Sequence, residues 1–183
     1  MTRYILLSIL LILSSCSLPG TQTEDTDLWE NITYIETNGI AINVPKTWTG
    51  ITNTANINPR AGSLVTAYVS NDAQWGFSNN LVILKDTLTD IITSEKYSTL
   101  NQIQTQKNYL EYIKKQDKIL TFHDGEVSRV FVFEAKYNES TPRMQYIQTA
   151  RVCGAEVYLI HFSLTVSKKA DNYITLLESF TCK

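Results

Sequence analysis

Residues 125–166 constrain the fold more than any other part of the sequence. They predict three long strands joined by short turns, of which the last covers residues 156–166. One face of this last strand is formed by Tyr158, Ile160, Phe162, Leu164 and Val166. The opposite face carries Val157 and Leu159, because successive side chains of a strand point to opposite sides. Both faces of its first half are therefore apolar, and we expect a central strand that is covered from above and from below.

The remainder of the chain predicts further strands. Residues 31–36 and 39–44 form two short strand patterns, and the Asn38-Gly39 dipeptide between them favours a tight hairpin turn. Residues 64–70 and 80–85 predict two more strands, with a loop over residues 71–79 between them. The second of these strands is apolar on both faces, which is typical of a covered strand.

Two helices are expected. The first runs from Ser94, as its N-cap, to about Lys107, with Tyr97, Leu100 and Ile103 at helical spacing. We favour an extended segment after it, although residues 109–113 also fit a continued helix. The second follows Ser167 as its cap and places five apolar side chains on one face: Ala170, Tyr173, Ile174, Leu177 and Phe180. Two helices and a mostly antiparallel sheet predict an α+β fold, an α/β/α sandwich with helices on the faces of the sheet.

The N-terminus predicts export. Residues 1–15 contain Arg3 and then an aliphatic run over residues 5–13, which is shorter than the roughly 20 residues that cross a bilayer. Leu13-Ser14-Ser15-Cys16 resembles the lipobox of bacterial lipoprotein signal peptides. This resemblance implies cleavage before Cys16 and attachment of diacylglycerol and an amide-linked acyl chain such as palmitate. A plain secretory signal with an incidental cysteine is the alternative.

The expected organisation is a signal peptide (residues 1–15), a flexible tether (16–30) and one domain (31–183). The tether is rich in polar and acidic residues, which cannot pack into a core. The expected location is the bacterial cell envelope, lipid-anchored and outside the cytoplasm. Export also favours a disulfide between Cys153, in a hairpin turn, and Cys182, after the last helix. Two buried free thiols are the alternative.

No residue pattern predicts a metal site, a cofactor or an enzyme. The net charge of −2 argues against a protein that binds nucleic acid through its charge. His161 and Ser163 share one face of the last strand, which is where a nucleophile–base pair would have to lie, but the pattern favours a structural histidine. Trp75 and Phe77 form a binding candidate in a loop, and their alternative is a lid folded onto the sheet.

Three places resemble the PsbP-like superfamily, which includes photosystem PsbP and bacterial lipoproteins of the DcrB and LpqN types. They are the segment Gly39-Ile40-Ala41-Ile42-Asn43-Val44-Pro45 with Trp48, the strand at residues 80–88, and the half that begins at Asp124-Gly125 and ends at Phe180. The resemblance implies an α/β/α sandwich and a non-catalytic protein that docks onto or assembles partners. It transfers no binding residues.

Two hypotheses about function follow. The first is a membrane-anchored envelope lipoprotein that uses this domain as a protein-binding or assembly module. The alternative is a small ligand-binding or hydrolytic lipoprotein with a pocket near His161 and Ser163.

Overall fold

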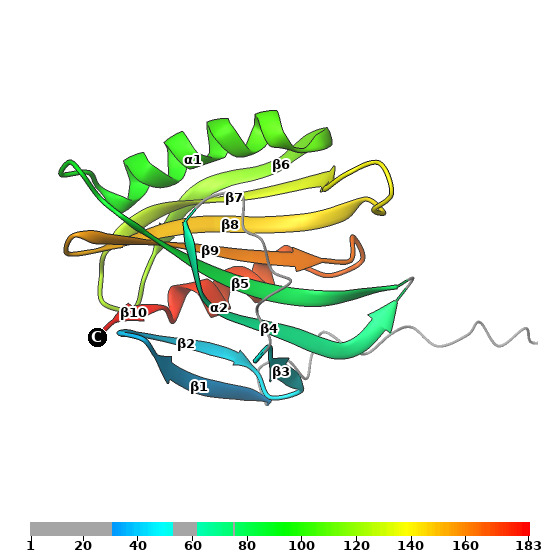
Figure 1. Cartoon of the computed structure of the whole chain (residues 1–183), viewed down its shortest axis with the longest axis horizontal. Coiled ribbons are helices and arrows are strands. Elements are labelled where there is room, and N and C mark those ends of the chain that lie inside the picture. The colour runs from blue at the N-terminus through cyan, green and yellow to red at the C-terminus, as the bar shows by residue number, and fades with distance from the viewer. Residues whose placement is uncertain (1–30, 53–61, 75) are drawn as a thin grey trace, which may run out of the picture.

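A seven-stranded antiparallel sheet forms the centre of the fold (Figure 1). The computed structural model describes residues 31–52, 62–74 and 76–183. The strand order is β3-β4-β5-β9-β8-β7-β6. The strands are β3 (Trp48–Gly50), β4 (Ser63–Gln74), β5 (Phe77–Thr87), β6 (Leu110–Thr121), β7 (Val127–Lys136), β8 (Met144–Cys153) and β9 (Glu156–Leu164). The expected central position of β9 is confirmed, because it pairs with β5 on one side and β8 on the other.

One face of this sheet is covered by helix α2 (Ala170–Glu178) and by a three-stranded sheet of β1 (Ile32–Thr37), β2 (Ile40–Pro45) and β10 (Thr181–Cys182). The largest apolar core lies between these layers. Its members include Ile83, Ile160 and Phe162 from the large sheet, Ile42 from β2 and Leu177 from α2. The predicted β1–β2 hairpin is confirmed, and its turn residues have the positive φ angles that Asn-Gly turns require: 47° at Asn38 and 79° at Gly39.

Helix α1 (Ser94–Asn108) covers the opposite face of the large sheet (Figure 1). The α+β sandwich predicted from the sequence is therefore confirmed, with one helix on each face. Neither helix in the described part of the chain is long and apolar enough to cross a membrane.

The buried face of α1 is polar, which corrects the sequence-based expectation. Four side chains face the sheet: Ser94, Ser98, Gln102 and Thr105. Leu100 and Ile103, expected to pack inward, are 52% and 51% exposed. The physical reason is that the sheet offers hydrogen-bond partners here: Ser98 donates to the carbonyl of Arg129 (2.7 Å), and Gln102 donates to the Tyr112 hydroxyl (2.6 Å).

Both helix starts also differ from expectation. The N-cap of α1 is Thr93, whose hydroxyl accepts from the Lys96 N–H at 3.2 Å. Ser94 is buried, and its hydroxyl instead bonds the backbone N–H of Val152 at 2.9 Å. Helix α2 starts three residues after Ser167, and no side-chain bond caps it.

Two strand regions differ from the sequence-based expectation, and a third agrees with it. Residues 71–79 were expected to form a loop, but β4 extends to Gln74 and β5 starts at Phe77, so only residues 75 and 76 separate the two strands. Trp48 was expected in a turn, but it begins β3 and packs against Phe162 (ring centroids 5.8 Å apart). After α1 the chain is extended from Tyr109 and enters β6, as favoured from the sequence.

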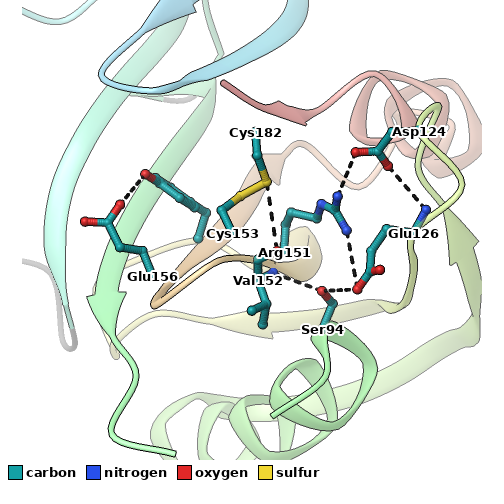
Figure 2. The surroundings of a disulfide bond; sticks show 9 residues. Ser94, Asp124, Glu126, Arg151, Val152, Cys153, Glu156 and Cys182 are labelled. Atoms are coloured by element: carbon teal, nitrogen blue, oxygen red, sulfur yellow. Dashed lines mark hydrogen bonds and ion pairs between the residues drawn. A yellow bond between two sulfur atoms is a disulfide. The ribbon is translucent and has the colours of Figure 1, made fainter. Parts of the chain in front are cut away.

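The predicted disulfide joins Cys153 at the end of β8 to Cys182 in β10, with Cα atoms 5.8 Å apart (Figure 2). Beside it, Arg151 is buried and pairs with Asp124 at 2.7 Å and Glu126 at 3.4 Å. The disulfide and this ion-pair network connect the end of β8 to the C-terminus and to the β6–β7 turn. The C-terminal segment is thus attached covalently to the large sheet.

Candidate functional site

A cavity of about 480 Å³ lies between α1 and the face of the large sheet that α1 covers. Its floor is formed by Val82 and Leu84 of β5 and Leu159 of β9. The wall from α1 consists of Asn101, Gln104, Thr105 and Asn108. Aromatic side chains, with Met144 and Thr141, form one end of the cavity: Phe77, Tyr109, Tyr137 and Tyr146. The end of α1 and the β7–β8 connection lie at the same end of the large sheet (Figure 1). The volume is in the range of small-molecule sites.

Strand pairing brings polar side chains together beside this apolar floor. Val82 of β5 is opposite His161 of β9, and His161 is opposite Gln148 of β8. Residues that are directly opposite on neighbouring strands share one face of a sheet. The next row places Ser163 opposite Tyr146 on the same face. These five residues come from three strands, β5, β8 and β9, and meet below α1.

Gln148 connects the helix to His161. Its amide lies 3.3–3.4 Å from the Thr105 hydroxyl, and its Oε1 lies 3.2 Å from His161 Nδ1. Burial lowers the pKa of His161 to about 4. The imidazole is therefore neutral at pH 7, because its charged form is poorly solvated here. Although protein atoms surround the ring, part of its surface remains accessible from the cavity.

The aromatic end of the cavity is a cluster of stacked and edge-on rings. Tyr146 lies 4.8 Å from Tyr109, 5.1 Å from Phe133 and 5.3 Å from His161, measured between ring centroids. Tyr137 extends the cluster at 5.9 Å from Tyr109 and is 40% exposed. This end offers flat apolar surfaces that reach the solvent.

The cavity carries no formal charge on its described lining. None of its described lining residues is Asp, Glu, Lys or Arg. Across residues 31–52, 62–74 and 76–183, no group of three or more His, Cys, Asp or Glu side chains is placed to hold a metal ion. The donors and acceptors that the cavity presents are amides, hydroxyls and an imidazole.

The structure places the sequence candidates as follows. His161 and Ser163 both line the cavity, but no hydrogen bond joins them among the described residues, and His161 Nδ1 is engaged with Gln148. Phe77 is half-buried and lines the aromatic end. Trp75 and Cys16 lie outside the described residues, so their proposed roles stay predictions.

Sequence reasoning missed the α1 wall and Gln148. A signal was present for the helix, because Asn101, Gln104, Thr105 and Asn108 follow the i, i+3, i+4, i+7 spacing of one helix face. A polar stripe at this spacing usually faces solvent, so the sequence alone does not distinguish it from a polar stripe that faces the sheet. For Gln148 the strand pattern contains no comparable signal.

Comparisons with known proteins support the fold. No protein-family model matches the chain, and no curated protein matches its sequence. The solution structure of cyanobacterial PsbP (CyanoP) from Synechocystis is similar at a TM-score of 0.58 and 10% identity, over 84% of this chain and 93% of that one. A protein of unknown function from Pseudomonas aeruginosa is similar at a TM-score of 0.49 and 10% identity, over 79% and 90% of the two chains. The chain has a PsbP-like fold, as the sequence resemblance implied.

Proposed function

We propose that this chain is a lipid-anchored binding protein of the bacterial cell envelope, and that its PsbP-like domain holds a small molecule without transforming it. The observation that carries the proposal is the cavity beneath α1, which has the size and mixed polarity of a ligand site. The domain needs no cofactor for this role.

Binding fits the chemistry of the cavity better than hydrolysis. A general base must reach the proton that it removes, and its pKa should lie near the working pH. His161 is a weak base because burial lowers its pKa to about 4, and its Nδ1 is paired with Gln148. Among the described residues, Ser163 therefore has no activating partner.

The anchor is proposed from the sequence at Cys16, which follows an apolar segment and a pair of serines. Each acyl CH₂ buried in the bilayer contributes about 0.8 kcal/mol, so several chains hold a protein stably. Cys16→Ser should release the protein from the membrane fraction, measured by cell fractionation and immunoblotting. Ser17→Ala is the matched control and should remain bound. Retention of the Cys16→Ser protein in the membrane would contradict the anchor.

The ligand itself can be sought in purified protein. The protein is purified from envelope extracts and then denatured, and the small molecules that it releases are identified by mass spectrometry. Ser163→Phe adds bulk inside the cavity, whereas Gln106→Phe adds the same side chain to an exposed position of α1 that does not line it. We expect compounds that the wild type and Gln106→Phe both release and that Ser163→Phe lacks. Identical profiles for all three proteins would refute the proposal.

Protein docking is a second candidate, favoured by the exposed Leu100 and Ile103 on the outer face of α1. The resemblance to the PsbP-like superfamily also implies docking. Crosslinking in intact cells should capture a protein partner that is lost in the Leu100→Ser/Ile103→Ser variant and kept in Gln106→Ser. A crosslinking pattern that is the same in all proteins would exclude this face as the docking site.

A further inference from the structure

We infer that the ligand of the cavity is an uncharged molecule with a flat ring system and an N–H or O–H donor. This inference rests on the proposed binding function and adds the chemical class of the ligand. Three observations carry it: the uncharged lining, the aromatic end and the acceptor that His161 presents.

The uncharged lining selects against ions. A charged group that leaves water loses solvation, and the loss is offset when an opposite charge pairs with it. The described lining contains no Asp, Glu, Lys or Arg side chain that could form such a pair. A neutral ligand loses far less solvation on entry, so the cavity discriminates by charge.

The aromatic end selects for flat rings. Tyr109, Tyr137 and Tyr146 line it and belong to one ring cluster. Aromatic pairs gain from offset-stacked and edge-to-face contacts beyond their buried area. The apolar floor of Val82, Leu84 and Leu159 continues these surfaces inward. A planar ring system can therefore contact apolar surface along the whole cavity.

His161 supplies the hydrogen-bond acceptor. With Gln148 Oε1 at 3.2 Å, Nδ1 is the nitrogen that carries the proton and donates. The neutral ring then has a lone pair on Nε2, which has no partner among the described residues. Because the ring lines the cavity, a ligand N–H or O–H is the group that satisfies Nε2.

The test uses a matched pair of fluorescent probes. N-phenyl-1-naphthylamine is neutral, contains two flat ring systems and carries one N–H, and 1-anilinonaphthalene-8-sulfonate has the same rings plus a negative charge. The protein is residues 17–183, exported behind a cleavable signal so that the disulfide forms and no acyl chain binds the probe. We expect saturable binding of the neutral probe and binding of the sulfonate that is at least about tenfold weaker.

Variants assign the binding to this cavity. Ser163→Phe should abolish binding of the neutral probe, whereas the exposed Gln106→Phe should preserve it. Gln104→Lys, at an exposed position of the cavity wall, should strengthen sulfonate binding by about threefold. Circular dichroism confirms that each variant is folded.

A third probe tests the donor. The N-methylated form of the neutral probe lacks the N–H, and the wild type should bind it about fivefold more weakly, as expected for one lost hydrogen bond. In His161→Phe this preference should vanish, because the acceptor is gone. A preference that persists in His161→Phe, or that is absent from the wild type, would overturn the role of His161.

The outcomes separate this inference from the proposed function. Equal binding of the neutral and sulfonate probes, both lost in Ser163→Phe, would overturn the ligand chemistry and leave the binding function standing. Phenyltrimethylammonium is a cation with a flat ring that can compete with the neutral probe. If it displaces the neutral probe with the same affinity as that probe itself, the inferred preference for an uncharged ligand is overturned in favour of a cation. Failure of every probe to bind the folded protein would overturn both.

Discussion

The disulfide permits a quantitative prediction. Cys153 and Cys182 are 29 residues apart in sequence, so the bond closes a loop of about 30 residues in the unfolded chain. The loss of chain entropy for this length is about 12 cal/mol/K, which corresponds to about 3.6 kcal/mol at 25 °C. The native structure should lose little else in Cys153→Ala/Cys182→Ala, because α2 and Phe180 remain packed in the large core. The midpoint of thermal unfolding should fall by about 7–14 °C for a domain of this size.

The assay is thermal and urea unfolding of residues 17–183, followed by circular dichroism. Reduction of the wild type, checked by thiol titration, is the matched control and should reproduce the effect of the double variant. The urea m-value should rise on reduction, because the released unfolded chain exposes more surface. A fall in the unfolding midpoint of less than about 3 °C, with both thiols titratable, would refute the reasoning. It would mean that the disulfide does not stabilise the fold by restricting the unfolded chain.

Three further predictions concern α1 and the face beneath it. The pKa of His161 is about 4 in the folded state and 6.5 in the unfolded state, so the unfolded state binds the proton more tightly. The free energy of unfolding should therefore be highest above about pH 6.5 and fall by up to about 3 kcal/mol as the pH drops towards 4. Urea unfolding should show this slope in the wild type and not in His161→Phe, and parallel profiles would contradict it. Thr93→Ala should cost about 1 kcal/mol as a lost N-cap. Ser94→Ala should cost about 1–3 kcal/mol, because the half-buried Val152 N–H loses its acceptor and the Glu126 carboxylate, which still pairs with Arg151, loses the Ser94 hydroxyl. A smaller effect than that of Thr93→Ala would contradict this assignment.

The sequence alone predicted the parts of the fold that depend on local periodicity. Alternation with apolar residues on both faces identified β9 as central, and the i, i+3, i+4, i+7 pattern identified the buried face of α2. The Asn38-Gly39 turn and the Cys153–Cys182 pair followed from backbone preference and export chemistry. These features are set by neighbours in the chain, or by the chemistry of few residues, so a single sequence reveals them.

The polar face of α1 was beyond local reasoning. Ser98 and Gln102 have the spacing of a solvent-facing stripe, and Leu100 and Ile103 look like the buried one. The orientation is reversed because the carbonyl of Arg129 and the Tyr112 hydroxyl offer partners on the sheet. Hydrogen-bond partners that come from distant strands leave no mark in the periodicity of the helix itself.

The cavity also depended on tertiary structure. Sequence reasoning placed His161 and Ser163 on one strand face, which the structure bears out. It could not place Val82 and Gln148 on either side of His161, because the order of the strands in the sheet decides which residues become neighbours. The side-chain period determines which face a residue takes, whereas long-range strand pairing decides what it meets there.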